Sequence, residues 1–213
     1  INECMSRGIS ICIFDYRGYG KSSGRTNTDT MHKDMEDVYK YLIYKLKHNP
    51  ELYSPEYDMT FGERESGFNS LNFYGDEFCE TILEALHPSM QEYTGLELIS
   101  EYGYLRLYQK DDILPYHNDR PSCEISTTLC VGYQGETNWS LWLENKNKEK
   151  IPVNLEPGDM LIYKGCELNH WREKYEGEHH LQAFLHYNNK NGPFGNNIFD
   201  GRENLGLPAL LKK

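Results

Sequence analysis

The chain has 213 residues and a formal net charge of −11, and hydrophobic residues make up 38% of it. This length fits one domain of ordinary size plus a short appendage, with enough apolar residues for a packed core. The acidic net charge argues against a protein that binds the phosphates of nucleic acid, because phosphate binding needs a surface with clustered basic residues. No apolar run approaches the roughly 20 residues of a membrane-spanning helix, so we expect no membrane partner either.

The six cysteines lie at positions 4, 12, 79, 123, 130 and 166, and no two of them form a C-x-x-C pair. In a chain of this length such a spread is typical of reduced thiols and not of a disulfide framework. The printed sequence begins at Ile1 without a methionine, and no secretory leader is expected from it. These features predict a reducing, cytoplasmic location. Cys123, Cys130 and Cys166 are expected to be small buried residues and not ligands of zinc or an iron–sulfur cluster.

Residues 1–48 predict a strand, a turn and a helix. Ile9 to Phe14 is a short apolar run with branched residues, which is typical of a buried strand. A turn rich in glycine and serine follows it. From Asp29 to Leu46 apolar residues recur every three or four positions, which predicts an amphipathic helix. The segment therefore forms half of a βαβ unit that is appended to the rest of the chain.

The letters FDYRGYGKSSG in this segment resemble an internal strand and helix of the α/β-hydrolase fold, over about the first quarter of the chain. Gly20 to Gly24 also fits G-x-S-x-G, the nucleophile motif of that fold. In the family this loop precedes the nucleophile, so Ser22 is not expected to be catalytic. A phosphate-binding loop is excluded, since its first glycine would fall at Asp15. We interpret residues 1–48 as a structural strand-turn-helix or a fused hydrolase fragment.

The next segment predicts a linker and then a second helix. Residues 49–67 carry prolines and glycines between mixed charges and are expected to form an irregular linker. Residues 68–74 indicate no definite element. From Asp76 to Tyr93 apolar residues recur at helical spacing, with Pro88 expected to end or kink the helix and Gly95 expected to close it.

From Glu101 onward the sequence predicts short strands that are rich in aromatic and β-branched residues. They are expected at Tyr102–Tyr108, Glu124–Val131, Trp139–Leu143, Ile151–Leu155, Met160–Lys164 and Leu181–Tyr187. Many short strands at such spacing are typical of a sandwich or jelly roll. The predicted fold class is therefore mainly β with flanking helices, and the main domain spans residues 68–213.

A group of metal-ligating residues lies among these strands. His117 and Asp119 form an H-x-D pair, and His170 follows 51 positions after the aspartate. On a strand, residues i and i+2 project from the same face, so both members of the pair can hold one ion. Two imidazoles and one carboxylate form the facial triad of non-haem Fe(II) sites and leave coordination positions open. Singly, His117 fits a loop histidine bonded to Asp119 and His170 fits a strand cap, but together the three residues predict a metal site.

Residues from about Leu71 to the end resemble a 2-oxoglutarate- and Fe(II)-dependent dioxygenase of the prolyl-4-hydroxylase type. The resemblance is carried by Tyr104–Tyr108 (YLRLY), His117-Asn118-Asp119, Ser126–Leu129 (STTL) and Leu155–Tyr163 (LEPGDMLIY), which leads to His170. It implies a double-stranded β-helix, a jelly roll of two sheets. It also implies that 2-oxoglutarate and O2 share the open iron positions. Decarboxylation to succinate and CO2 would then drive hydroxylation of an unactivated C–H bond.

The resemblance further implies a basic residue for the far carboxylate of 2-oxoglutarate, about ten positions after the second histidine. Position 180 is a histidine here, and a neighbouring dianion would raise its pKa. We rank His180 first and Arg172 a near second, since arginine offers a bidentate fork to a carboxylate. His179 and Arg120 are further candidates, and Tyr108 matches a family tyrosine whose hydroxyl reaches the cosubstrate. No catalytic residue is expected beyond the metal ligands.

The implied function is an oxidoreductase that hydroxylates a small-molecule or peptidyl substrate, with Fe(II), 2-oxoglutarate and, as an accessory reductant, ascorbate. Three alternatives stay open: a metal-binding but catalytically inactive jelly roll, an α/β-hydrolase remnant, and a binding module without metal. Trp139, Trp142 and Trp171 are expected in the core or the pocket wall. They are not expected to form a nucleic-acid stacking platform, because the surrounding charge is acidic.

Overall fold

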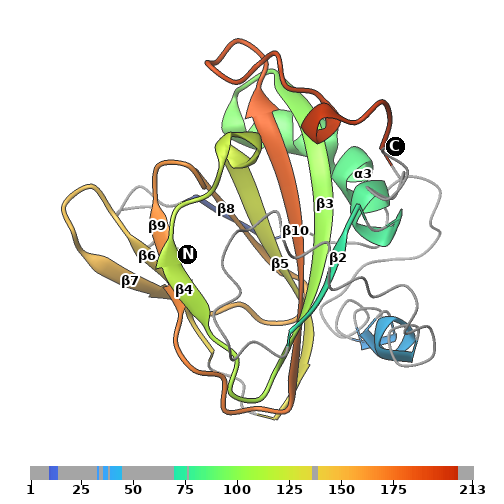
Figure 1. Cartoon of the computed structure of the whole chain (residues 1–213), viewed down its shortest axis with the longest axis vertical. Helices are drawn as coiled ribbons and strands as arrows, with labels where there is room; N and C mark the ends of the chain where they lie inside the picture. Colours follow the sequence, from blue (N-terminus) through green and yellow to red (C-terminus); the bar gives the residue numbers. More distant parts are fainter. Residues whose placement is uncertain are drawn as a thin grey trace.

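The computed structural model describes residues 10–13, 33, 36–37, 39–44, 70–75, 77–135 and 139–205. The linker predicted for residues 49–67 and the glycine-rich turn with Ser22 lie outside these residues. In the described part of the chain, strands dominate and form two antiparallel sheets, which confirms the predicted mainly β class (Figure 1).

The larger sheet has six strands and the smaller sheet has four. In spatial order the larger sheet holds β1 (Ser10–Ile13), β8 (Asp159–Tyr163), β5 (Ile125–Gln134), β10 (His179–Asn189), β3 (Leu98–Gln109) and β2 (Leu71–Tyr74). The smaller sheet holds β4 (Leu114–His117), β9 (Asn169–Arg172), β6 (Leu141–Glu144) and β7 (Lys150–Val153). The helix α3 (Glu77–Thr94) and the short 3-10 helices η3 (Pro121–Cys123) and η4 (Phe199–Gly201) complete the described elements. The winding of a double-stranded β-helix stays a prediction.

Two apolar layers lie on either side of the larger sheet, because successive side chains of a strand point to opposite faces. One layer joins the two sheets and contains Cys130, Leu141, Leu143, Ile151, Val153, Leu155, Leu161 and Tyr163. The other layer lies between the larger sheet and α3, where Leu83 and Met90 pack with Leu105 and Leu185. Figure 1 shows α3 beside β3 and β2, away from the smaller sheet. The helix therefore supports the larger sheet and leaves the space between the sheets to the site.

Several strand and helix predictions need correction. His117 was expected on a strand, but no bounds were predicted for β4 or β9, because each has only four residues, too few for a visible alternation. β3 begins at Leu98, earlier than expected. Pro88 does not end α3, which continues to Thr94. Leu86 and Met90, on either side of the proline, are buried against the sheet, and this packing outweighs the lost backbone hydrogen bond.

The described residues of the N-terminal segment agree with the predicted strand and helix. β1 pairs antiparallel with β8, with Ser10 opposite Ile162. Residues 39–44 are helical, and Leu42 is 1% exposed within the apolar layer of α3. The ring of Tyr39 lies against Gly132 of β5, where a side chain would collide with it. The segment thus contacts the larger sheet, while its division from residues 68–213 as a separate unit stays a prediction.

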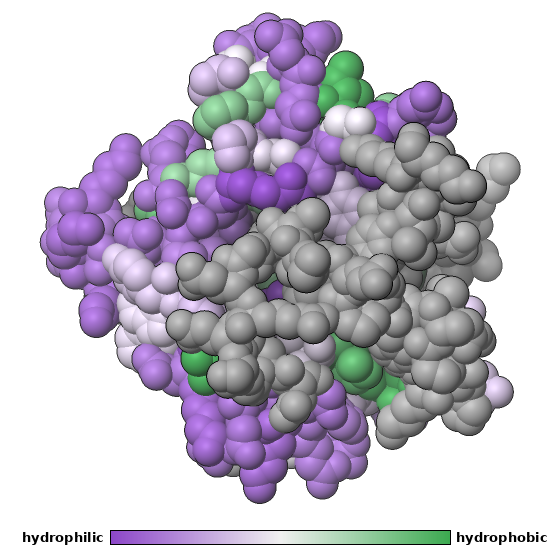
Figure 2. Space-filling view, in the orientation of Figure 1, coloured by the Kyte–Doolittle hydropathy of each residue, from purple (hydrophilic) through white to green (hydrophobic). Residues whose placement is uncertain are grey.

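The described surface shown in Figure 2 is largely polar. On the face shown in Figure 2, the described residues are mostly hydrophilic, and apolar residues form small separate groups. Among the described helices, none combines the length and apolar character needed to cross a bilayer.

Candidate metal centre

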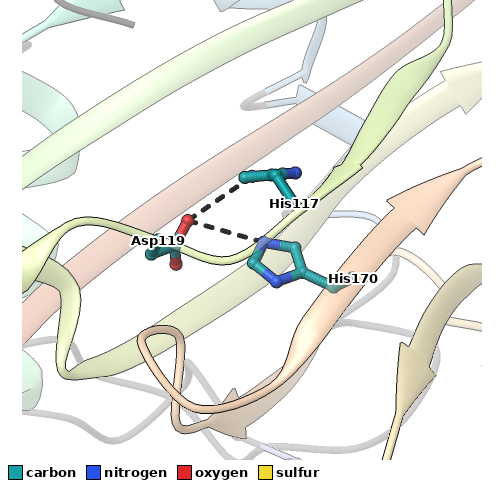
Figure 3. A group of neighbouring side chains, drawn as sticks. All are labelled: His117, Asp119 and His170. Carbon is teal, nitrogen blue, oxygen red and sulfur yellow. Dashed lines mark ion pairs between the residues drawn. The ribbon is translucent and has the colours of Figure 1, made fainter.

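The three predicted ligands come together between the two sheets. Nε2 of His117 and Nε2 of His170 each lie 3.5 Å from Oδ1 of Asp119. One ligand atom from each residue can be chosen so that all three lie within 4.8 Å of one another. Figure 3 shows both imidazoles and the carboxylate converging on one point from different segments. This convergence was the main structural expectation of the sequence, and the structure has it.

Strand pairing places the two histidines side by side. His117 ends β4, and its partner across the ladder is His170 of β9. Asp119 lies beyond the end of β4, so the prediction that His117 and Asp119 share one strand is wrong. The backbone N–H of Asp119 instead donates to the carbonyl oxygen of Gly165 at 2.9 Å. A side chain on Gly165 would collide with the Asp119 carboxylate, so this close approach requires glycine.

Backbone carbonyls fix the orientation of both imidazole rings. Nδ1 of His117 lies 2.7 Å from the carbonyl oxygen of Pro115, and Nδ1 of His170 lies 3.0 Å from that of Leu168. A carbonyl only accepts, so each Nδ1 carries a hydrogen, and Nε2 is the ring nitrogen that can offer a lone pair to a metal ion. Two lone pairs and a carboxylate that face one another need a cation between them. The donor set and its orientation therefore fit a divalent ion of the Fe(II) type.

Asp119 is ionised despite its burial. Burial acts to raise the pKa of Asp119, but its contacts with the imidazoles of His117 and His170 outweigh burial and hold the pKa well below its ordinary value. The hydroxyl of Ser126 donates to Oδ2 at 2.9 Å, which leaves Oδ1 directed at the histidines. The carboxylate is thus held in the form and orientation that a metal ligand needs.

Asp119, Cys123 and His186 form a second cluster whose ligand atoms lie within 4.8 Å of one another. Burial raises the pKa of the Cys123 thiol well above its ordinary value, so the protonated thiol is a poor ligand. Its sulfur lies 3.1 Å from the hydroxyl of Tyr102. Nδ1 of His186 lies 3.0 Å from Oγ of Ser126, and burial lowers the pKa of His186 to about 4. These contacts favour the triad as the metal site and His186 as a neutral wall residue.

A cavity of about 340 Å³ borders the triad and reaches the inner face of the larger sheet. Its walls include Tyr104 and Tyr108 of β3, Tyr163 of β8 and Phe184 of β10. Arg106 also lines it. The predicted strand Tyr102–Tyr108 contained the signal for this arginine, since alternate positions of a strand share one face. Sequence reasoning did not use that signal, nor did it identify Ser126, Tyr163 or His186.

Arg172 is enclosed between the sheets. It lies on β9 two residues after His170 and is 3% exposed. Nη1 donates to the carbonyl oxygen of Trp139 at 2.5 Å, and the guanidinium carbon lies 4.6 Å from the centre of the Trp139 ring. Among the residues that the structure describes, no ion pair involves Arg172, and burial lowers its pKa. A buried cation without a neighbouring anion is costly unless a ligand supplies the negative charge.

The two histidines predicted for the cosubstrate occupy different faces of β10. His180 is buried, with its ring near Tyr133 and Trp139, and its Nε2 lies 2.8 Å from Nε2 of Gln182. Burial, together with nearby Arg172, lowers the pKa of His180 well below its ordinary value, so the ring is neutral. His179 points to the opposite face, because neighbours on a strand alternate. Neither side chain borders the cavity described above.

The remaining candidates divide between structure and cavity. Arg120 makes two hydrogen bonds to Asp200, of 2.6 and 2.8 Å, and lies over the ring of Tyr102. Its guanidinium is therefore used to hold the C-terminal segment. Tyr108 is fully buried, borders the cavity and packs edge-on against Trp139 with ring centres 4.8 Å apart. Its predicted contact to a bound cosubstrate stays a prediction.

The predicted tryptophans and cysteines also have definite places. Trp139 is buried with Tyr108 and Tyr175, as expected of a core residue. Trp142 and Trp171 stack on each other with ring centres 5.9 Å apart, across the pair β6–β9. Cys123 and Cys130 are buried and form no disulfide, as expected, whereas Cys166 is half-buried, so its prediction as a buried residue is wrong.

The sequence matches no protein-family model and no curated protein at a significant level. Solved structures share its fold. A prolyl-4-hydroxylase from Pseudomonas putida aligns with a TM-score of 0.56 at 15% identity, covering 88% of this chain and 96% of that one. HygX from Streptomyces hygroscopicus, with nickel and 2-oxoglutarate bound, aligns with a TM-score of 0.55 at 13% identity, covering 89% and 86%.

A third solved structure is described by its family. It is an oxidoreductase of the 2OG-Fe(II) oxygenase family from Burkholderia pseudomallei, which aligns with a TM-score of 0.50 at 15% identity and covers 61% of this chain and 72% of that one. The chain has the fold of the 2-oxoglutarate- and Fe(II)-dependent oxygenases. At these identities the likeness concerns the fold of the oxygenases and not their substrates.

Proposed function

We propose that the protein is a 2-oxoglutarate-dependent non-haem iron dioxygenase that hydroxylates an unactivated C–H bond. The observation that carries the proposal is the convergence of two imidazoles and one carboxylate, within 4.8 Å, at the edge of a cavity. The oxygenase fold supports it independently. Fe(II) with 2-oxoglutarate would supply the activation of O2, with release of succinate and CO2.

The chain's own residues would bind and orient the reactants. His117, Asp119 and His170 would hold the ion on one face and leave its other positions to small molecules. The Nδ1 contacts of both histidines to backbone carbonyls would keep the rings in place through turnover. The aromatic side chains around the cavity would exclude bulk water from the reacting atoms. The substrate would be a small molecule or a peptidyl side chain.

We propose Arg172 as the anchor of the far carboxylate of 2-oxoglutarate. It projects from the same face of β9 as His170, one alternate position along, so a short dicarboxylate can span the ion and the guanidinium. Arg172 is buried and has no anionic neighbour among the described residues. A bound cosubstrate carboxylate would supply the negative charge that offsets the cost of burying this cation. Tyr108 borders the cavity and packs against Trp139, whose ring covers Arg172. The neutral, enclosed ring of His180 is less suited, so the order of the two candidates is reversed.

The free cysteines of the described part of the chain support the proposal of a reducing, cytoplasmic location. Ascorbate would serve only to keep the iron reduced.

Succinate formation from 2-oxoglutarate, Fe(II) and O2 tests the proposed activity. The wild-type protein should form succinate, and His170→Ala should abolish it because a metal ligand is lost. Asn118→Ala is the matched control, since its side chain donates to the carbonyl oxygen of Cys166 and not to the triad. Absence of succinate from a metal-loaded wild-type protein would favour the inactive, metal-binding alternative.

The KM for 2-oxoglutarate tests the proposed anchor. Arg172→Gln should raise it by about tenfold or more, because a charge-assisted hydrogen bond contributes about 1.5–3 kcal/mol. Iron binding should survive the substitution, since Arg172 touches no ligand atom of the triad. An unchanged KM in Arg172→Gln, with a raised KM in His180→Ala, would restore His180 as the anchor.

A further inference from the structure

The wall of the cavity formed by β3 carries a second arginine. Tyr102, Tyr104, Arg106 and Tyr108 occupy alternate positions of this strand and all border the cavity that contains the triad. Of the described residues that line this cavity, Arg106 is the only lysine or arginine. Its partner across the β3–β10 ladder is Gln182, whereas Tyr102, nearer the triad, is opposite His186. Arg106 therefore faces a part of the cavity away from the iron ligands.

The guanidinium of Arg106 is held in a fixed orientation. Its Nε donates to Oδ1 of Asn72 on β2 at 2.5 Å, and Nη2 donates to the hydroxyl of Tyr104 at 3.3 Å. Its central carbon lies 5.5 Å from the ring centre of Tyr104 and 5.4 Å from that of Tyr108. Because an amide and two aromatic rings already fix this arginine, its side chain loses little conformational entropy when a ligand binds. This favours ligand affinity.

Arg106 and Arg172 are separated by aromatic rings. Tyr108 lies against Arg106 and packs edge-on against Trp139, and Trp139 in turn covers Arg172. One arginine belongs to β3 of the larger sheet, and the other to β9 of the smaller sheet. The far carboxylate of a single 2-oxoglutarate would occupy one of them. The arginine beside His170 suits that carboxylate, and the arginine on β3 is left to a different anion.

We propose that Arg106 binds a carboxylate of the primary substrate, whose apolar body lies against Tyr104 and Phe184. The inference rests on the proposed function and adds a substrate class to it: an anionic molecule or side chain with a flat or apolar body. The planar fork of arginine matches a carboxylate, and the aromatic walls match an apolar group. The negative charge of the protein as a whole makes a local cation necessary for such a substrate.

Calorimetric titration with two probes that differ only in charge tests this assignment. The probes are 3-phenylpropanoate and its neutral amide, added to wild-type protein with and without Mn(II) and 2-oxoglutarate. A second pair, a short phenylalanine-containing peptide with one glutamate and its glutamine counterpart, tests a peptidyl source of the same carboxylate. The wild-type protein should prefer the carboxylate in at least one pair by about tenfold or more. No charge preference in either pair overturns the proposal.

Variants locate the preference. Arg106→Gln should abolish it, and Lys146→Gln, which removes one positive charge from an exposed position, should retain it. If Arg106→Gln does not fold, Arg106→Lys decides: a preference weakened several-fold supports a bidentate arginine contact, and an unchanged preference overturns it. A KM for 2-oxoglutarate that rises in Arg106→Gln but not in Arg172→Gln would make Arg106 the cosubstrate anchor and also overturn the proposal.

The two hypotheses fail separately. A carboxylate preference that depends on Arg106, without any succinate formation, would leave the anion site standing and remove the dioxygenase function. Succinate formation without a carboxylate preference would support the dioxygenase function and remove the anion site at Arg106.

Discussion

Ser126 joins the candidate metal centre to the larger sheet. Its hydroxyl lies 2.9 Å from Oδ2 of Asp119, 3.0 Å from the carbonyl oxygen of Cys123 and 3.0 Å from Nδ1 of His186. A ligand carboxylate whose second oxygen is held by a neighbour keeps one orientation before the metal arrives. The sequence placed Ser126 on a strand but gave no sign of this contact, because Asp119 reaches it through a loop.

Ser126→Ala should weaken metal binding. Without the hydroxyl, Oδ2 of Asp119 loses its donor and the carboxylate is free to rotate, so affinity should fall by about 10- to 100-fold. Anaerobic titration of wild-type and variant protein with Mn(II) measures this difference. Thr128→Val is the control, because Thr128 lies on the same face of β5 and its hydroxyl bonds to Gln182. Equal affinities of Ser126→Ala and wild type would show that the contact does not orient the ligand.

Glu101 is a fully buried carboxyl group on β3 that contacts the C-terminal segment. It accepts hydrogen bonds from Asn188, from Asn197 and from the backbone N–H of Asp200. Burial raises the pKa of Glu101 to about 8 in spite of these donors. The folded protein thus keeps a proton on Glu101 that the unfolded chain loses near pH 4.5.

Stability should therefore fall as the pH rises from about 4.5 to 8. In this window the folded state binds more protons than the unfolded state, and one such proton changes the free energy of unfolding by up to about 1.4 kcal/mol per pH unit. Glu101→Gln should remove this slope while keeping the neutral shape. Urea unfolding of both proteins at several pH values measures it. A free-energy difference between them that stays constant across the window would contradict the pKa shift.

The C-terminal segment fastens the loop that carries Asp119. Asp200 in η4 accepts two hydrogen bonds from Arg120 and one from Ser122. Arg120 directly follows the candidate ligand Asp119 in the sequence. Asp200 has a φ of 55°, a left-handed conformation that asparagine and aspartate tolerate better than most residues. Pairing between positions 80 residues apart leaves no local pattern. For this reason Arg120 was a reasonable cosubstrate candidate from sequence, and only the fold assigned it elsewhere.

The N-terminal segment packs on the larger sheet but contributes none of the triad. We predict that a protein beginning at Asn69 folds and keeps its metal binding. It should lose at least about 2 kcal/mol of stability, because Leu42 is buried in the native chain and the backbone of β8 loses its partner β1. Urea unfolding and Mn(II) titration of the shortened protein measure both quantities. Insolubility of this protein would mean that residues 1–68 are an integral part of the domain.

At the scale of the whole molecule, local sequence patterns predicted the class of fold and the three residues that converge in the candidate metal centre. Alternating aromatic and branched residues marked strands such as β3, β5 and β10, and an H-x-D pair followed by a distant histidine had a chemical meaning of its own. The anchor of the cosubstrate was harder to choose. His180 stood at the expected spacing, but which cations are buried between two sheets depends on tertiary packing; Arg172, for example, has no ion pair with any described residue.

The proposed function depends on one metal ion held by three side chains. Anaerobic equilibrium dialysis against Fe(II) tests this most directly, with wild-type protein beside His117→Ala, Asp119→Ala and His170→Ala. The wild type should retain one Fe(II) per chain, and each variant should lose it while remaining folded by circular dichroism. Retention of a full equivalent of iron by any folded variant, or none by the wild type, would contradict the candidate metal centre.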